Sequence, residues 1–489
     1  MRKTLVMLSI SALLGACASM APKYERPVAP VPQAWPTGPA YAPAAGQSTA
    51  PGQSAAGQNT APGQNIASDP NVAAAAIPWK TFFKDEKLQR LIEQALVNSR
   101  DLRRTLANIE SARAQYRIQR ADLLPHLTAD LSGSKGKVVS TTGQGAVNSA
   151  SYSASGGLSS FEIDLFGRLR SLSDAAFESY LSTEEAGRAT RISLIAETAS
   201  AYLAYAADNT QLAISRRTLE SAQRSMDLTQ KRLQSGVASR VDVRQAETVY
   251  QTARADVANL TATIAQDRNA LELLVGSPVD DALLPTELPL ETTWLADVPA
   301  GVSSDVLLNR PDILEAEHNL KAANANIGAA RAAFFPSLTL TGSGGLASTA
   351  LSSLFSGGTH VWSVAGGLSL PIFSGGANVA NLDYTKAQKL VYVSAYELAV
   401  QTAFREVADA LAVRGTIQES LDAQGALVEA ASESYRLADA RYSRGIDTFL
   451  NSLDSQRTLY GAEQSLVSTR LAALNNSVTL YRALGGGLE

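Results

Sequence analysis

The chain has 489 residues, a formal net charge of −4 and 18% charged residues. It holds no basic block of the kind that binds nucleic acid, which argues against a nucleic-acid partner. Its only cysteine is Cys17, so a disulfide within the chain is excluded. A composition rich in alanine, serine and leucine favours long helices.

Residues 1–16 have the pattern of a signal peptide. Arg2 and Lys3 precede an apolar core that is too short to span a bilayer. The segment ends in Leu-Gly-Ala-Cys17, which resembles the bacterial lipobox, so we expect a covalent lipid on Cys17 and no other cofactor. Ala18 stands where aspartate would favour the inner membrane, which indicates the outer membrane. An ordinary secretory signal with a chance cysteine is the alternative.

Residues 17–77 are predicted to form a lipidated N-terminal tether. Most of this stretch is rich in proline, glycine, glutamine and alanine, and glycine-glutamine pairs recur in it. Such a composition cannot bury enough apolar surface to form a core. Beyond residue 17 no apolar run reaches the length of about 20 residues that a membrane helix needs.

The remaining chain divides into two copies of one unit, 78–304 and 305–489. Both copies follow the same order: a helix, strands, a long helix, a tight turn and a second helix, which indicates a duplication. In the first copy a short helix and the helix from Asp101 to Leu124 precede strands at about 127–165, a long helix at about 168–235, a helix at 240–275 and a connector. In the second copy the elements are a helix at 312–334, strands at about 337–372, a long helix at about 376–443 and a helix at 448–484.

Three prolines mark the boundaries between helical and strand-like segments. Pro125 and Pro336 each follow a helical pattern and precede a strand-like one, and Pro371 closes the second strand region. Proline cannot continue a helix and moves the residue before it out of the α region. We therefore expect these residues to form a helix-to-strand junction that occurs twice in the chain.

The long helical segments carry apolar residues seven positions apart, as at Leu212, Leu219, Met226 and Leu233. Sustained spacing of seven indicates helices that supercoil with left-handed twist. A helix of some 65 residues would be about 100 Å long, which no compact globular domain accommodates. The stripes hold too few bulky residues for one thick core, and we expect the helices to form the wall of a hollow cylinder.

The strand-like segments have the pattern of a membrane β-barrel. Between Val361 and Leu370 apolar and small residues alternate, a period of two that is typical of strands facing lipid on one side. Four strands cannot close a barrel, and open strand edges are not tolerated in lipid. Three copies would supply twelve strands around a water-filled bore.

Several motifs together resemble the TolC-type outer-membrane factors, most closely their lipidated, OprM-like branch. The resemblance covers nearly the whole chain from Cys17 to Gly487, apart from the glycine-glutamine tether. The motifs that carry it are Arg26-Pro27, Asn98-Ser-Arg-Asp-Leu102, Gln115-Tyr-Arg-Ile-Gln-Arg-Ala-Asp-Leu-Leu-Pro125, Asp164-Leu-Phe-Gly-Arg-Leu-Arg170, Arg310-Pro-Asp-Ile-Leu-Glu-Ala-Glu317, Arg331-Ala-Ala-Phe-Phe-Pro336 and Arg441-Tyr-Ser-Arg-Gly-Ile-Asp-Thr-Phe-Leu450.

The resemblance implies a mixed α and transmembrane β fold. A homotrimer would form a twelve-stranded β-barrel in the outer membrane, with four strands per subunit, continued by a long periplasmic α-helical barrel. It further implies the exit channel of a tripartite efflux pump for drugs and toxic small molecules. Its partners would be a periplasmic adaptor protein, an RND-type inner-membrane transporter and outer-membrane lipid.

The resemblance also implies a periplasmic gate formed by Leu450, Asp454 and Arg457. These residues follow the second turn at spacings of four and three, so they share one helical face. In a trimer Leu450 would form an apolar collar, Asp454 an acidic ring that selects cations, and Arg457 an ion pair that holds the closed state. A simple surface pair is the alternative. The first copy lacks the acidic residue and has nearby Val241, Arg244 and Gln245.

The hairpin tips are the expected contacts of the adaptor protein. They comprise Gly236 and Val237 in the first copy, and Gly445, Ile446 and Asp447 in the second. Glycine at a turn also ends a helix, so a purely structural role for these glycines is the alternative. The structural role and the adaptor contact can both hold.

The sequence holds no constellation that indicates catalysis, and we expect no enzyme. The three histidines, His126, His318 and His360, lie in unrelated settings without ligands at metal-binding spacing. A pore-free coiled-coil protein is a second hypothesis, but it leaves the signal and the charge-poor strands unexplained. A third keeps the channel and changes its cargo to metal ions or, as in type I secretion, to a polypeptide.

Overall fold

The structure is a computed structural model that describes residues 19–41, 77–139, 146–289, 294–296 and 304–487. The chain divides into two compact units, and both sequence copies contribute to each of them. Unit 1 comprises Met1–Val28, Ala107–Glu185 and Leu314–Leu398, and unit 2 comprises Ala29–Leu106, Ala186–Ile313 and Ala399–Glu489.

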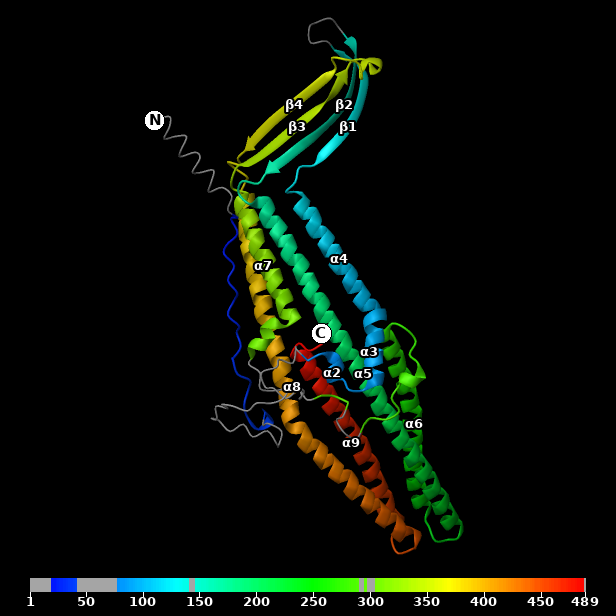
Figure 1. Ribbon diagram of the computed structural model, residues 1–489. Helices are drawn as coiled ribbons and strands as arrows, with labels where there is room; N and C mark the ends of the chain where they lie inside the picture. Colours follow the sequence, from blue (N-terminus) through cyan, green and yellow to red (C-terminus); the bar gives the residue numbers. More distant parts are fainter. Residues whose placement is uncertain (1–18, 42–76, 140–145, 290–293, 297–303, 488–489) are drawn as a thin grey trace, which may run out of the picture. The chain divides into compact units, whose positions relative to one another are not determined.

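Figure 1 labels the helices and strands along the chain. The first copy contains α2 (Trp79–Phe82), α3 (Glu86–Asn98), α4 (Arg100–Ala121), β1 (Leu127–Val139), β2 (Ala146–Ile163), α5 (Arg168–Gln234) and α6 (Arg240–Val275). The second copy contains α7 (Pro311–Ala332), β3 (Ser337–Ser348), β4 (His360–Ser369), α8 (Ala377–Ser443) and α9 (Phe449–Ala483). Short 3-10 turns lie at Pro39–Tyr41, Asp281–Leu283, Ser304–Asn309 and Leu351–Ser353.

The four strands of unit 1 form one antiparallel sheet in the order β1-β2-β3-β4 (Figure 1). The register is continuous except between Leu158 and Phe161, where β2 is irregular against β3. Ser160 adopts a positive φ of 51° within this irregularity, and its N–H donates to the Thr341 hydroxyl at 3.2 Å. That hydrogen bond satisfies a backbone group that the interrupted ladder would otherwise leave unpaired.

The register gives the sheet two chemically different faces, because side chains alternate along each strand. Two cross-strand serine pairs lie on the polar face: Ser132 with Ser153 (Oγ–Oγ 2.7 Å) and Ser343 with Ser363 (2.9 Å). Val138 and Val361 also lie on the polar face, but most bulky apolar residues of the four strands lie on the other one, among them Leu127, Leu131, Leu158, Leu338, Leu340, Leu346, Trp362, Val364 and Leu368. A face of hydroxyls backed by a face of leucines is suited to separate water from lipid.

An N-terminal strap, residues 19–28, lies along α7 within unit 1. Asn324 Nδ2 donates to the Pro22 carbonyl at 2.7 Å, and Arg331 Nη1 donates to the Met20 carbonyl at 3.1 Å. Gly328 lies between them, and a Cβ there would approach the Ala21 nitrogen to 2.6 Å. The absence of a side chain at Gly328 is therefore what lets the strap lie against the helix.

The carboxylate of Glu317 holds the strap to α7. It accepts hydrogen bonds from Arg26 at 2.6 Å and from Tyr24 at 3.2 Å, it pairs with Lys321 at 3.2 Å, and its side chain is 4% exposed. Burial opposes its ionisation, but the hydrogen bonds from Arg26 and Lys321 outweigh burial and keep the pKa of Glu317 below its ordinary value. Because the carboxylate is buried while the Arg26 side chain is 45% exposed, losing Arg26 would leave a buried charge with less compensation.

Unit 2 is organised around the buried guanidinium of Arg310. It donates to both carboxylate oxygens of Asp312, to Glu406 Oε2 at 2.9 Å, and to the Ala483 carbonyl at 2.6 Å near the end of α9. One side chain thereby links the start of α7, the middle of α8 and the end of α9. Beside the end of α9, Tyr481 stacks on Phe82 with ring centroids 4.0 Å apart.

The turn that follows α6 shows why residue 276 is glycine. Gly276 has a φ of +76°, and a Cβ added there would lie 2.5 Å from the Asn98 carbonyl oxygen. At the other end of α6, Ser239 and Asp242 form a capping box in which each side chain accepts from the other residue's backbone N–H. These local features fix where α6 begins and ends.

Candidate functional site

The turns that join α5 to α6 and α8 to α9 have nearly the same conformation. Gly236 and Gly445 have φ values of +75° and +72°, and the residue after each glycine donates its N–H to a carbonyl five positions back. Those following residues are Val237 and Ile446, whose side chains are 77% and 63% exposed. In each tip, a glycine in the left-handed conformation is therefore followed by an exposed apolar side chain.

Asp447 has a local structural role in the second tip. Its carboxylate accepts the Thr448 N–H at 2.8 Å, Arg441 Nε at 3.0 Å and Asn451 Nδ2 at 2.8 Å. These interactions, led by the backbone hydrogen bond from Thr448, keep the pKa of Asp447 below its ordinary value. Asp447 thus fixes the start of α9 and the shape of the tip.

Arg232 links the first hairpin to the second within unit 2. Its two terminal nitrogens donate to the carbonyls of Tyr442 and Ser443, both at 3.0 Å, and its guanidinium lies 4.2 Å from the Tyr442 ring centroid. The same ring packs in a buried cluster with Phe449 and Leu453. The end of α5 is therefore bonded to the last turn of α8, where the chain enters the second tip.

The three predicted gate residues project from one side of α9, away from that cluster. Leu450 is 53% exposed, and Asp454 and Arg457 are also exposed. Arg457 donates from Nη2 to the Thr248 hydroxyl of α6 at 2.7 Å. Within one chain, Arg457 therefore bonds to a hydroxyl of the first hairpin. Its expected ion pair with a carboxylate in the trimer stays a prediction.

A set of half-buried tyrosine hydroxyls, which the sequence alone does not predict, joins α5 to the second hairpin. The Tyr460 hydroxyl donates to Asp256 at 2.7 Å and lies 2.8 Å from the Ser215 hydroxyl. The Tyr435 hydroxyl lies 2.8 Å from that of Ser221. Burial, followed by the hydrogen bond to Asp256, raises the pKa of Tyr460 to about 12. In the sequence, the sign of these contacts is that tyrosine and not phenylalanine occupies these positions of the apolar pattern with a spacing of seven.

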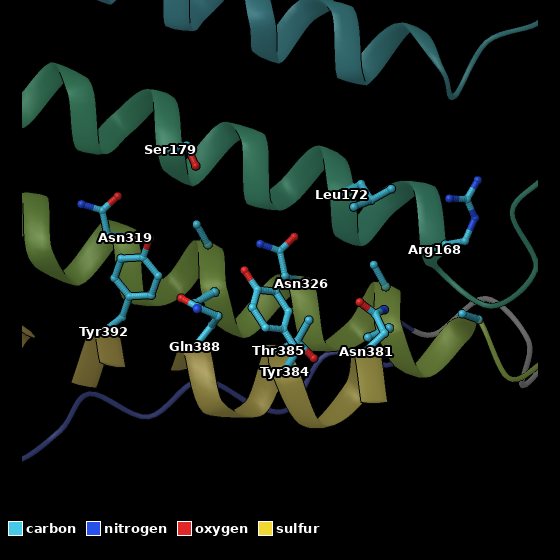
Figure 2. Close-up of a pocket in the computed structure, with 15 residues that line it drawn as sticks. Arg168, Leu172, Ser179, Asn319, Asn326, Asn381, Tyr384, Thr385, Gln388 and Tyr392 are labelled. Atoms are coloured by element: carbon cyan, nitrogen blue, oxygen red, sulfur yellow. The ribbon is translucent and has the colours of Figure 1, made fainter. Parts of the chain in front are cut away.

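A polar cleft of about 490 Å³ lies in unit 1 among α5, α7 and α8 (Figure 2). Figure 2 shows Asn319 and Asn326 of α7 and the tyrosines of α8 along this cleft. Its lining is neutral apart from Arg168, and the polar residues are Arg168, Ser179, Asn319, Asn326, Asn381, Tyr384, Thr385, Gln388 and Tyr392. Such a wall offers many weak hydrogen bonds and no fixed charge pattern.

The cleft and the strap occupy opposite faces of α7. The strap contacts Glu317, Asn324 and Arg331. The cleft is lined by Asn319 and Asn326. At about 100° per residue, the two sets are centred about 150° apart around the helix axis. Helix α7 therefore separates the strap from the cleft.

The predicted junction prolines lie between elements of unit 1. Pro125 lies between the end of α4 and β1, Pro336 between α7 and β3, and Pro371 just after β4. Near this boundary the rings of Phe166 and Phe335 stack at 4.8 Å. Cys17, the predicted lipid site, lies outside the described residues.

Two features of the described residues bear on other functions. No group of three or more metal-binding side chains occurs in the part of the chain that the structure covers. His318 instead contacts Glu178 at 2.6 Å between α7 and α5. Among the helices described, none combines the length and the apolar character that crossing a membrane requires.

Comparison with known proteins decides the family. The model of the outer membrane efflux protein family matches residues 91–277 and 302–486. The chain is 47% identical over 491 residues to the antibiotic efflux pump outer membrane protein ArpC of Pseudomonas putida, covering 100% of this chain and 96% of that protein. The same figures hold for the toluene efflux pump outer membrane protein TtgC, also of Pseudomonas putida.

The chain belongs to the outer membrane efflux protein family. A solved structure of the open state of the MtrE outer membrane channel from Neisseria gonorrhoeae is 38% identical, covers 96% of this chain and 99% of its own, and superposes with a TM-score of 0.81. The fold class predicted from the sequence, that of trimeric TolC-type channels, is thereby confirmed. This efflux protein is an outer-membrane drug-efflux channel and not an enzyme.

Asp454 provides the first test of the gate in this efflux protein. Replacing Asp454 by alanine should raise single-channel conductance and move the cation-to-anion permeability ratio toward one, because a ring of acidic residues attracts cations into a constriction. Planar-bilayer recordings under a salt gradient measure both quantities. The matched control is Asp101→Ala, which removes an exposed acid from α4. Unchanged conductance and selectivity in Asp454→Ala would remove this residue from the gate.

The hydrogen bond between Arg457 and Thr248 provides a second test. If this contact holds the closed state, Arg457→Ala and Thr248→Val should each favour the open state by about 1 kcal/mol, or about fivefold in open probability, since each removes the same exposed charged hydrogen bond. Because both changes break one contact, the double variant should open no more readily than either single variant. Additive effects on open probability in bilayer recordings would show that the two residues act independently.

Proposed function

We propose that this efflux protein is the outer-membrane exit channel of a tripartite pump that expels drugs and toxic small molecules. It works as a homotrimer, receives its cargo through a periplasmic adaptor protein, and is coupled to an RND-type transporter in the inner membrane. Outer-membrane lipid holds it through an acylated Cys17.

The observation that carries this proposal is the two-faced sheet with two free edges. One face bears leucines and the other bears serine and threonine hydroxyls, as a barrel wall between lipid and water requires. In the described sheet β1 and β4 each have a neighbouring strand on one side only. Pairing β1 of one copy with β4 of the next would satisfy both edges and close the wall.

The inner wall of unit 1 supports a channel with broad cargo. If the strap is anchored to lipid, it lies on the outer side of α7, and the cleft then faces the lumen. Its amide and phenol groups are neutral, so they would pass organic solutes of differing charge without strong retention. The two P. putida relatives are named for antibiotic and for toluene efflux at equal similarity, which supports small organic cargo.

The hairpin tips support the partner assignment. An exposed apolar side chain at each tip, Val237 and Ile446, is suited to bury against an apolar groove of the adaptor protein. The Arg232 hydrogen bonds fix the spacing of the two tips, so that the adaptor would meet a preformed surface.

The test of this function uses a bacterium that lacks its own outer-membrane efflux channel. Supplying the complete chain together with an adaptor and an RND-type transporter should restore accumulation of a fluorescent drug to the low level of the pumping strain. A variant with Val237→Asp and Ile446→Asp should still form trimers and conduct in bilayers but should fail to restore efflux. Full efflux by that variant would contradict the adaptor assignment, and a purified protein that forms no channel would contradict the function itself.

The lipid on Cys17 is tested separately. Cys17→Ser should remove the acyl chains, seen by mass spectrometry as the loss of the lipid mass from the N-terminal peptide. Because several chains on one residue contribute about 0.8 kcal/mol per buried methylene, the lipid alone would anchor the tether firmly. The Cys17→Ser protein, exported by another signal, should still form trimers, since the barrel spans the membrane by itself. A wild-type N-terminal peptide without lipid would refute the lipobox assignment.

A further inference from the structure

Two lysines of β1 lie on the face of the sheet that bears the leucines. Lys135 and Lys137 are separated from Leu131 by four and six positions, so alternation places all three side chains on one face. Both lysines are exposed and lie opposite Ala150 and Asn148 of β2. A charged side chain on a lipid-facing surface requires an explanation, because it is costly wherever it meets hydrocarbon.

No carboxylate lies beside these lysines in the described sheet. Its two acids, Asp130 and Glu162, are near the helix end of β1 and β2, and Glu162 pairs there with Arg168. From Leu131 to Phe161, and again from Ser337 to Leu382, the sequence contains no aspartate or glutamate, and Lys135 and Lys137 are its only lysine or arginine residues. These ranges include the connections between strands, so the same holds for neighbouring copies in a trimer. Three copies would place six positive charges around the outer part of the barrel, where these ranges supply no opposing acid.

The position of the lysines along β1 matches the far boundary of the hydrocarbon layer. At about 3.4 Å per residue, they lie about 27 and 34 Å along the strand from its first residue, Leu127. With a strand tilt of about 40°, this corresponds to about 20–26 Å along the membrane normal, and the apolar band of such barrels is about 25 Å tall. Since β1 begins next to the helices of unit 1, this boundary is the external one.

We propose that Lys135 and Lys137 bind the phosphate groups of a phosphorylated glycolipid in the outer leaflet, as an anionic-lipid site on the barrel exterior. The inference rests on the proposed function, because it requires the sheet to lie in the outer membrane. Long lysine side chains at a boundary extend toward the headgroups and keep their stems in the apolar layer. The ring of Tyr152 covers Gly133 on the same face, an aromatic of the kind that marks this interface.

The experiment titrates purified trimers in detergent with bis-phosphorylated lipid A or its dephosphorylated form, and counts bound lipid by native mass spectrometry. The wild-type protein should prefer the phosphorylated lipid. The variant with Lys135→Gln and Lys137→Gln should bind it about 30-fold more weakly, because each basic group near an anionic surface strengthens binding about fivefold. Its binding of the dephosphorylated lipid should not change.

Two controls accompany the variant. Lys80→Gln with Lys84→Gln makes the same change of charge at exposed positions near α2 and should leave lipid binding unaltered. Lys135→Arg with Lys137→Arg keeps the charge and should keep the preference for phosphate. Equal binding of the two lipids by the wild-type protein, or wild-type binding by the glutamine variant, would overturn the proposal.

Bilayer conductance of the same preparations separates the lipid site from the proposed function. Conducting wild-type channels without a phosphate preference would contradict the lysine site alone. A wild-type preparation without conducting channels would contradict the proposed function, and the lipid site with it.

Discussion

The unsatisfied hydrogen-bonding groups on the outer edges of β1 and β4 are the constraint on which the rest of the structure depends. In a bilayer no water is available to them, so each edge must meet another strand. The described sheet offers them no partner within the chain, which makes assembly a condition of the fold. The alternation of leucine and serine, the prolines that start the strands and the small residues between strands all serve a wall that only several copies complete.

Within each unit, a small number of polar contacts position the helices and the strap. Unit 1 holds a strap on one face of α7 and a polar cleft on the other, and the buried Glu317 carboxylate and the bare Gly328 backbone make the strap possible. In unit 2 the guanidinium of Arg310 joins the middle of α8 to the end of α9, while Arg232 and Arg457 join the two hairpins near their tips. The buried Arg310 contacts stabilise the body of unit 2, whereas the exposed contact of Arg457 with Thr248 contributes little to stability.

Much of this architecture was predictable from local sequence signals. Glycines with positive φ at Gly236 and Gly445, prolines at the junctions and a period of two in β4 indicate turns, boundaries and a membrane strand without knowledge of contacts. The family motifs supplied the fold class, which the comparisons confirm. The hydroxyl partners could not be predicted: a seven-residue stripe marks Tyr460 as apolar packing, and only the packing of α6 and α9 shows that its hydroxyl meets Asp256. The contact of Arg457 with the Thr248 hydroxyl within one chain was likewise not predictable, and its expected ion pair in the trimer stays a prediction.

The most direct test of this account is a single-particle structure of the protein solubilised from outer membranes. Three copies should form one closed barrel of twelve strands, with backbone hydrogen bonds between β1 of each copy and β4 of the next. A particle in which these edges remain unpaired, or are covered by a different part of the chain, would contradict the claim that the sheet is one third of a barrel.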